Sequence, residues 1–363
     1  MHCFFPLYYR ICAMRRVNEK SVLFIEVRLE VLSNNFTLLY QYFNQEDEFQ
    51  IKTHYLYNGK VSEMAYLSRC KKMIKDLATS KYVFLNEGSN VVSAVNLRKE
   101  TKLVQTWHGC GAFKKFGHSL NKELKEPFYR NYSLVTVSSQ EVVWAYKEAM
   151  QLTDEIVKPI GVSRTDLYFD QDFIQNAAKK VNEKFQIGTK KMILYAPTFR
   201  GEAHRASEAS VLEYKYLYEL LADKFVIVLK YHPVVQDHIK VPEEYQSFII
   251  NNDNQFSIEE LLCASDICIS DYSSLIFEYA LLERPMIFYA HDEQDYMDQR
   301  GFYYEYEQFT PGPVVKTKEE LAKAIIDADN YDVSCVKAFK DKFMSSCDGN
   351  ATKRIVEYIM QED

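Results

Sequence analysis

Short, continuously apolar segments alternate with longer amphipathic segments along most of the chain, and this alternation restricts the fold more than any other feature. The segments typical of strands are Ser21–Glu26, Tyr82–Leu85, Lys102–Thr106, Leu134–Val137, Ile156–Ile160, Lys191–Tyr195, Phe225–Lys230, Phe248–Ile250, Asp266–Ile269 and Pro285–Tyr289. The helical patterns between and after them are Phe36–Phe43, Met64–Ala78, Gln140–Met150, Ser257–Cys263, Leu275–Leu282, Lys318–Ala328 and Ala351–Met360. Strands that are apolar on both faces belong to parallel sheets covered by helices on both sides. The sequence therefore predicts an α/β protein.

The length of 363 residues suggests two domains, or one large domain. A polar helical segment over residues 170–190 interrupts the rhythm of strands and helices near the middle of the chain. We therefore expect two doubly wound domains with a cleft between them, over residues 1–155 and 156–363, with the last helix packing back on the first domain.

The composition excludes several classes of protein. With 44 Lys and Arg against 51 Asp and Glu, the net charge of -7 gives no indication of nucleic-acid binding. The eight cysteines form no CxxC pair and no zinc-binding spacing, and scattered thiols fit a reducing cytoplasm. There is no GxGxxG, P-loop or HExxH motif.

The first 16 residues combine aromatic side chains with Arg10, Arg15 and Arg16. No apolar run approaches the roughly 18 residues of a membrane span, and no small-residue cleavage site of a signal peptide follows. Two interpretations remain open for residues 1–20. One is a segment lying in the membrane interface, and the other is a helix packed on the body of the protein.

Four predicted strands end in residues suited to chemistry, at the edge where open parallel sheets bind ligands. These ends are Trp107-His108-Gly109, Pro197-Thr198-Phe199-Arg200, Tyr231-His232-Pro233 and Asp271-Tyr272-Ser273-Ser274. One histidine there often has only a structural role. Two of them, one in each half and each beside a Gly or Pro turn, favour an active site.

Other residues suit an anionic ligand such as a phosphate. Ser273 and Ser274 open a helix, where hydroxyl and free N–H groups bind phosphate, and Glu278 lies one turn further on the same face. Lys114 and Lys115 follow the first histidine at an expected helix start. Helix capping and solvated surface positions are the alternative roles.

Three arginines, Arg164, Arg200 and Arg300, lie in turn-like segments, and guanidinium groups match phosphate oxygens. Surface ion pairs are the alternative. The two DxD triplets, Asp170-Gln171-Asp172 and Asp327-Ala328-Asp329, do not follow apolar strands. We expect exposed carboxylates there and no metal site.

Several motifs in the right order resemble those of the CDP-glycerol glycerophosphotransferases of teichoic-acid and capsule synthesis. They are TWHGCGAFKKFG (106–117), GVSRTD (161–166), YAPTFRG (195–201), KYHP (230–233), SDYSSLIFEYALLERPMIFY (270–289), DEQDYMDQRGFYYEYE (292–307), PGP (311–313) and DGNATKRI (348–355). Together they are highly specific, although no single one is. One departure is Cys110-Gly111-Ala112, where many members carry Thr-Pro after the His-Gly pair.

The resemblance implies a GT-B-like architecture of two Rossmann-type domains. It implies transfer of glycerol phosphate, or another polyol phosphate, from CDP-glycerol or CDP-ribitol, with release of CMP. The acceptor would be a hydroxyl of an undecaprenyl-diphosphate-linked glycan or of a growing teichoic-acid or capsule polymer. No cofactor is required in this scheme. The enzyme would be cytoplasmic and peripheral on the inner face of the cell membrane.

Carried onto this sequence, the resemblance makes His108 and His232 the functional histidines. We expect His108 to remove the proton of the acceptor hydroxyl and His232 to stabilise charge on the leaving CMP. The expected contacts of the CDP-polyol are Gly109, Arg164, Pro197, Thr198, Arg200, Tyr231, Ser273, Ser274, Glu278 and Arg300.

Two alternative functions stay open from the sequence. One is a GT-B glycosyltransferase that uses a nucleotide sugar, and the other is a catalytically silent nucleotide-binding scaffold. Within the leading hypothesis, a chain without a large extra domain favours limited addition over polymerisation.

Overall fold

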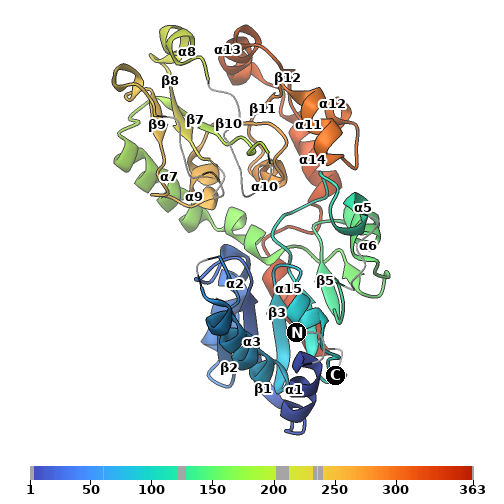
Figure 1. The fold of residues 1–363 in the computed structure, drawn as a ribbon. Helices are drawn as coiled ribbons and strands as arrows, with labels where there is room; N and C mark the ends of the chain where they lie inside the picture. Colours follow the sequence, from blue (N-terminus) through green and yellow to red (C-terminus); the bar gives the residue numbers. More distant parts are fainter. Residues whose placement is uncertain are drawn as a thin grey trace. The chain divides into compact units, whose positions relative to one another are not determined.

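The computed structural model (Figure 1) describes residues 4–59, 61–121, 128–201, 212–231, 235 and 240–361, with residues 297–300 described by their backbone alone. The chain forms two compact units. The first comprises Met1–Gly111, Phe116–Asp166 and Ser345–Asp363, and the second comprises Ala112–Lys115 and Leu167–Met344. This division differs from the predicted one after residue 155, because strand Val157–Lys158 joins the sheet of the first unit.

The first unit is built on a six-stranded sheet with the order β2-β1-β3-β4-β5-β6, and every neighbouring pair is parallel. Its strands are β1 (Asn18–Glu26), β2 (Gln50–Tyr55), β3 (Ser80–Leu85), β4 (Lys102–Gln105), β5 (Leu134–Thr136) and β6 (Val157–Lys158). Its helices are α1 (Phe4–Cys12), α2 (Asn34–Gln45), α3 (Glu63–Leu77), α4 (Asn90–Ser93), α5 (Gly117–Leu120), α6 (Val143–Met150) and α15 (Ala351–Gln361).

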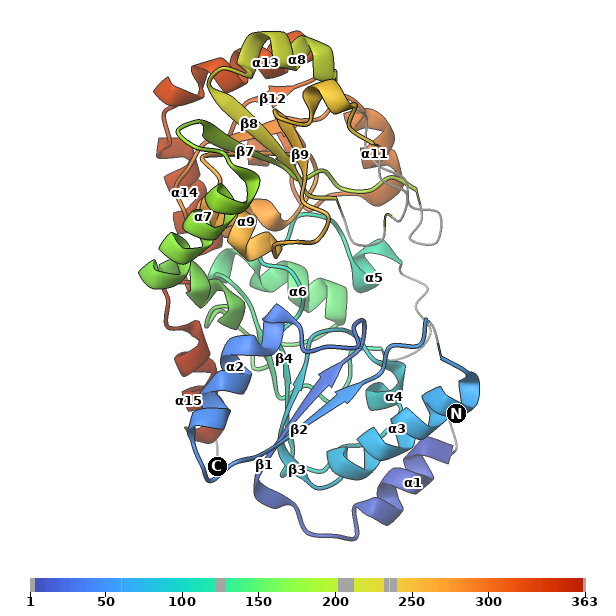
Figure 2. The ribbon, with the colours of Figure 1, turned by 90° about the vertical axis from the view of Figure 1, so that its left-hand side faces the viewer.

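Helices α2 and α15 cover one face of this sheet, and α3, with α1 packed on it, covers the other (Figure 2). On the first face, the rings of Phe24 and Phe84 stack with centroids 5.0 Å apart, and Phe36 from α2 meets Phe24 at 5.3 Å. Ile355 and Ile359 of α15 complete this cluster. Because side chains alternate along a strand, the neighbouring residues face α3, and strands buried on both faces result.

The second unit has another parallel six-stranded sheet, with the order β9-β8-β7-β10-β11-β12. Its strands are β7 (Lys191–Tyr195), β8 (Phe225–Leu229), β9 (Ile249–Asn251), β10 (Ile267–Ser270), β11 (Met286–Tyr289) and β12 (Val314–Val315). Its helices are α7 (Gln171–Phe185), α8 (Tyr214–Leu221), α9 (Ile258–Ala264), α10 (Leu275–Ala280), α11 (Glu293–Arg300), α12 (Tyr306–Phe309), α13 (Lys318–Asp327) and α14 (Ser334–Phe343).

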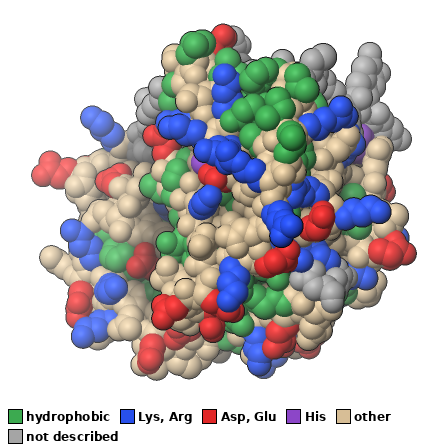
Figure 3. Space-filling view, turned by 90° about the horizontal axis from the view of Figure 1, so that it is seen from below, with side chains coloured by type: hydrophobic (Ala, Val, Ile, Leu, Met, Phe, Trp, Pro, Cys, Tyr) green, Lys and Arg blue, Asp and Glu red, His purple; other side chains and the backbone are tan. Residues whose placement is uncertain are grey.

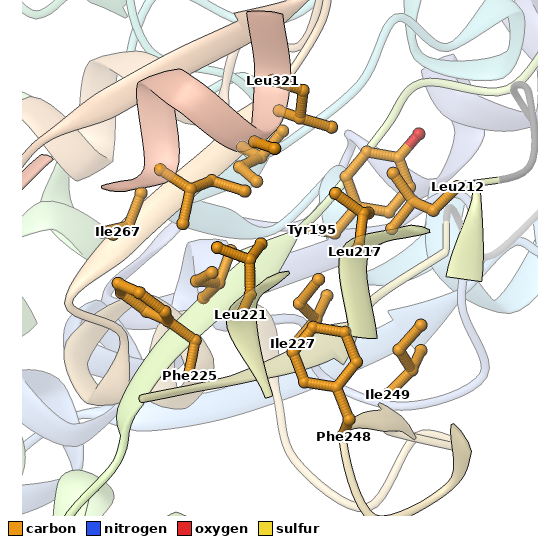
Figure 4. Packing of buried hydrophobic residues seen from close by; sticks show 14 of the residues in the cluster. Tyr195, Leu212, Leu217, Leu221, Phe225, Ile227, Phe248, Ile249, Ile267 and Leu321 are labelled. Carbon is orange, nitrogen blue, oxygen red and sulfur yellow. The ribbon is translucent and has the colours of Figure 1, made fainter. Parts of the chain in front are cut away.

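The core on one face of the second sheet is formed by α8 and α13 (Figure 4). Leu217 and Leu221 of α8 and Leu321 of α13 meet Ile227 and Phe248, and all five side chains are buried. Helix α9 lies against β7, and α7 packs along α9. The two sheets confirm the predicted α/β class with parallel strands covered by helices.

The strand order reverses once in each sheet, between β1 and β3 in the first unit and between β7 and β10 in the second. At such a point the chain leaves the carboxyl ends of neighbouring strands in opposite directions, which opens a crevice suited to ligands. These two sheet edges are therefore the places to examine for a functional site.

The N-terminal helix α1 packs on the first unit and still presents an apolar face to solvent. Phe5 and Tyr9 are buried, whereas Phe4, Leu7 and Ile11 are exposed, and their spacing places these three on one side of the helix. The end of the first unit that carries α1 shows apolar side chains beside Lys and Arg side chains (Figure 3). Among the helices that the structure describes, none is long and apolar enough to cross a bilayer.

Candidate active site

His108 lies at the carboxyl edge of the first sheet, in the loop that follows β4. Its Nδ1 atom is 2.8 Å from Oε1 of Glu87, which follows the neighbouring strand β3. Nε of Arg28, from the loop after β1, lies 2.8 Å from the same carboxylate oxygen. The Glu87 side chain is only 8% exposed and that of His108 is 37% exposed. A buried carboxylate therefore contacts a half-exposed imidazole at the carboxyl edge of the sheet, one strand from the point where the strand order reverses.

The loop that carries His108 is held by contacts from several elements. Nη1 of Arg164 donates to the His108 carbonyl oxygen at 2.9 Å and to Oδ1 of Asn35 at 2.8 Å. The hydroxyl of Tyr146 donates to the carbonyl oxygens of Gly109 and Gly111, at 3.2 and 3.0 Å. These contacts place Arg164 and Gly109 at the same sheet edge as His108, whereas the sequence predicts both as contacts of the CDP-polyol.

In the second unit, Asp271 lies at the corresponding place, the carboxyl edge of the sheet. It follows β10, is 1% exposed, and accepts hydrogen bonds from the backbone N and Oγ1 of Thr198 at 2.8 and 3.0 Å. The backbone N of Tyr272 donates to it as well, at 2.6 Å. Because Thr198 follows β7, Asp271 ties together the two loops that flank the reversal of strand order.

Arg200 adds a second charge to this cluster. Its guanidinium lies 3.0 Å from the Asp271 carboxylate and makes a two-pronged contact with Asp292, at 2.5 and 3.0 Å. It also lies over the rings of Tyr272 and Tyr296, 5.2 and 5.0 Å from their centroids. Two carboxylates and two rings therefore hold Arg200 in place.

The ion pair shifts the protonation equilibria of both partners. Burial raises the pKa of Asp292, but the hydrogen bonds and charge of Arg200 outweigh it, so this pKa lies below its ordinary value. For Arg200, burial lowers the pKa, and the two carboxylates more than compensate, so the guanidinium stays charged. Burial, followed by the charge of Asp292, raises the pKa of Tyr272.

The serine segment predicted to bind phosphate lies beside Asp271. Oγ of Ser273 accepts a hydrogen bond from the backbone N of Leu275 at 3.3 Å, and Ser274 precedes α10. Glu278 lies inside α10 and is buried, so the alternative of a surface position is wrong. Helix α10 has six residues, so its dipole is short.

The remaining predicted residues have different outcomes. Pro197 follows β7 directly, and Tyr231 packs half-buried against the core of the second unit. His232 lies outside the described residues. Arg300 ends α11, with its side chain outside the described part of the chain.

The segment Ala112–Lys115 leaves the His108 loop and packs within the second unit; we call it the docked segment. The ring of Phe113 stacks with Phe309 at a centroid distance of 4.8 Å, and its carbonyl oxygen accepts from the backbone N of Tyr303 at 2.9 Å. Lys114 donates to the Tyr296 hydroxyl at 3.3 Å. Lys114 thus has a protein partner at the position where the sequence suggests an anionic ligand.

The acidic triplets lie away from these edges. All four aspartates are exposed, as predicted, and Asp170 caps α7 by accepting from the backbone N of Asp172 and Phe173 at 3.0 Å. Within the residues that the structure describes, no group of three or more His, Cys, Asp or Glu side chains could hold a metal ion.

The sequence analysis gave no role to four charged side chains at these two sheet edges: Arg28, Glu87, Asp271 and Asp292. Glu87 follows the strand segment Tyr82–Leu85 closely, in the same way that His108 follows Lys102–Thr106. A search for charged side chains after every predicted strand would have found Arg28 and Glu87. Asp271 was part of a quoted motif, but only its serines were given a role.

Comparisons with known proteins identify the family of the chain. The family model "CDP-Glycerol:Poly(glycerophosphate) glycerophosphotransferase" matches residues 7–361. The chain is 35% identical to the teichoic acid poly(ribitol-phosphate) polymerase of Bacillus spizizenii, over 94% of this chain and 56% of that protein. It is 32% identical to the teichoic acid ribitol-phosphate primase of the same organism, over 97% and 94%. It thus spans little more than half of the first relative and nearly all of the second.

Solved structures show the same fold. The wall teichoic acid polymerase TagF superposes with a TM-score of 0.81 at 22% identity, covering 99% of this chain and 94% of that one. A UDP-N-acetylglucosamine 2-epimerase from Listeria monocytogenes gives a TM-score of 0.59 at 13% identity, over 95% and 97%. The predicted GT-B-like architecture is thereby confirmed. The chain belongs to the CDP-glycerol:poly(glycerophosphate) glycerophosphotransferase family, which includes the teichoic acid polyol-phosphate primases and polymerases.

Proposed function

We propose that this protein transfers glycerol phosphate or ribitol phosphate from the CDP-polyol to a hydroxyl of a lipid-linked teichoic-acid acceptor and releases CMP. The observation that carries the proposal is His108, a half-exposed imidazole backed by a buried carboxylate at the carboxyl edge of a parallel sheet. Family membership supplies the reaction class. Relatives with ribitol-phosphate and glycerol-phosphate names both match at 30% identity or more, so both donors enter the test.

The reaction needs a base, a positioned phosphate and a stabilised leaving group. The acceptor oxygen attacks the β-phosphorus, a new P–O bond forms, and the bond between this phosphorus and the bridging oxygen of CMP breaks. His108 takes the proton of the attacking hydroxyl, because imidazole changes its charge near neutral pH. Phosphoryl transfer depends mainly on positioning and on stabilising charge, which fixed hydrogen-bond donors supply.

In this scheme the CDP-polyol donor binds at the carboxyl edge of the sheet in the second unit. The reversal between β7 and β10 brings Thr198, Ser273 and Ser274 to one sheet edge, and Asp271 fixes the loops that carry them. In this scheme Arg200 acts through Asp271 and Asp292, since both carboxylates hold its guanidinium. The donor contacts of Tyr231, Glu278, Arg300 and His232, and the role of His232 toward CMP, stay predictions.

The protein would work at an anionic membrane surface, where a lipid-linked acceptor resides. The exposed face of α1 formed by Phe4, Leu7 and Ile11 suits insertion at the depth of the lipid headgroups. Arg10, on the same helix, is exposed and suits phosphate groups. This supports a peripheral attachment through α1.

The test measures CMP release from CDP-glycerol and from CDP-ribitol with a lipid-linked disaccharide acceptor. We expect acceptor-dependent CMP from one donor, lost in His108→Ala and kept in the matched control His54→Gln. His54 is also a partly buried histidine near a carboxylate, 2.8 Å from Oδ2 of Asp76. No CMP from either donor, with folded protein and a competent acceptor, would refute the proposal. Turnover of a UDP- or GDP-sugar would then indicate a glycosyltransferase, and binding without turnover a silent scaffold.

A further inference from the structure

The surroundings of His108 leave only one ring nitrogen for substrate. Nδ1 is buried and lies against Oε1 of Glu87, with its N–H direction off the line to that oxygen. The exposed part of the side chain must therefore be the other edge of the ring, which carries Nε2. Contacts of this kind often align only when substrate binds, so the distance of 2.8 Å is the informative quantity.

Gln105, the last residue of β4, connects Glu87 to the His108 loop through hydrogen bonds. Its buried side chain donates from Nε2 to the Glu87 carbonyl oxygen at 3.1 Å and accepts at Oε1 from the backbone N of Trp107 at 2.9 Å. Trp107 has a φ of 55°, which places it in the left-handed region that a side chain of this size rarely adopts. Strained backbone beside a catalytic group persists where the surrounding contacts enforce a geometry that the reaction needs.

Arg28, whose side chain is 65% exposed, provides a second contact to the Glu87 carboxylate. A guanidinium can only donate hydrogen bonds, and an ionised carboxylate can only accept them. Because Nε of Arg28 and Nδ1 of His108 approach the same oxygen, that oxygen is held as an acceptor facing the imidazole. A neutral imidazole that donates from Nδ1 keeps its lone pair on Nε2.

We propose that Glu87, oriented by Arg28, is a positioning residue that fixes His108 as the Nδ1–H tautomer with Nε2 free to accept the proton of the acceptor hydroxyl. The proposal rests on the proposed function, since it assigns a partner to the base of that reaction. Glu87 itself touches no reacting atom. It acts through His108, as the third member of a catalytic triad orients the histidine of that triad.

The test separates positioning from activity by observing the imidazole directly. Nitrogen-15 spectra of the full chain labelled in its eight histidines report the tautomer, and His108→Ala identifies the signals of His108. In Glu87→Ala we expect the Nδ1–H fraction of His108 to fall. We also expect kcat for CMP release to drop by at least about 10-fold and up to about 10,000-fold, the loss seen when the third member of a triad is altered, with KM for the CDP-polyol within about twofold.

A conservative variant and a matched control sharpen the test. In Glu87→Gln the amide oxygen should take the place of Oε1, because Arg28 still demands an acceptor there. This variant should keep the Nδ1–H tautomer and recover most of kcat. The control Glu30→Gln removes another carboxylate from the same edge, paired with Arg69 at 3.0 Å, and should leave both readouts unchanged.

The possible results decide between the claims. A wild-type tautomer in Glu87→Ala, or a shifted tautomer with unchanged kcat, would overturn the positioning role. If the wild-type protein releases no CMP from either donor, the proposed function fails, and the tautomer measurement alone still shows whether Glu87 sets the imidazole. A thermal unfolding midpoint equal to that of the wild type shows that each variant is folded.

Discussion

The guanidinium of Arg164 donates a hydrogen bond of 2.9 Å to the carbonyl oxygen of His108, across 56 residues of sequence. The resemblance assigns Arg164 to the donor diphosphate, whereas this contact makes it a support of the loop that carries the proposed base. The two roles have different kinetic consequences, and this allows them to be separated.

Replacing Arg164 should therefore affect turnover more than donor affinity. In Arg164→Gln we expect kcat to fall by up to about 100-fold, because a small displacement of the reacting group is costly. KM for the CDP-polyol should stay within about twofold of the wild type, measured by steady-state CMP release. A large rise in KM with intact kcat would instead support the contact with the diphosphate.

Replacing Asp271 should destabilise the second unit. Asp271→Asn removes a buried charge that faces Arg200 and two donors of Thr198, and breaking a buried pair costs roughly 3 to 5 kcal/mol in free energy of unfolding. Urea unfolding followed by circular dichroism measures the change. The control Asp329→Asn removes an exposed partner of Lys191 and should cost less than about 1 kcal/mol. Equal effects of the two variants would refute the central role of Asp271.

The Arg200–Asp292 pair should make the fold sensitive to acid. The pKa of Asp292 is lower in the folded protein than in the unfolded chain, where it is about 3.9. Its ionised form therefore stabilises the fold above about pH 4, and this contribution is lost as the pH falls through the folded pKa. In Asp292→Asn the free energy of unfolding should decline less steeply below about pH 4, measured by urea unfolding at a series of pH values. An acid decline identical to that of the wild type would contradict this linkage.

Negative charges introduced on the exposed face of α1 should weaken the binding of the protein to membranes. Burying a Leu or Ile side chain contributes about 1.5 kcal/mol or more, so Leu7→Glu with Ile11→Glu should weaken binding by about 100-fold. Cosedimentation with vesicles of phosphatidylglycerol and cardiolipin gives the bound fraction. The control Ile326→Glu changes an equally exposed apolar residue on α13 and should bind like the wild type. Equal binding of all three proteins would exclude α1 as the attachment site.

The sequence predicts the strands that are apolar on both faces and misses an edge strand and a short helix. The strand segments Tyr82–Leu85 and Lys191–Tyr195 match β3 and β7, which are buried on both sides. Strand β2 was missed because it is an edge strand with partly exposed residues, and its polar side chains hide the pattern. Helix α8 was missed although its buried residues, Tyr214, Leu217 and Leu221, have helical spacing.

The candidate site was predictable in its positions but not in its contacts. The sequence places His108 and Thr198 after the carboxyl ends of strands, and the structure has both residues there. The partners of these residues depend on strand order, which is not written in the local pattern: Glu87 and His108 meet because β3 pairs with β4, and Thr198 and Asp271 because β7 pairs with β10. Knowledge of which strands are neighbours would have added the carboxylates of Glu87 and Asp271 to the predicted site.

The place of α15 in the first unit has a consequence for the order in which the two units can fold during translation. Ile355, Val356 and Ile359 of α15 belong to the core that also contains Val22 and Phe24 of β1. The first unit therefore cannot close its core until α15, which lies beyond the whole of the second unit in the sequence, has left the ribosome. The second unit, apart from the docked segment, is continuous and is complete by Met344. The first unit thus begins to emerge before the second unit and completes its core after it.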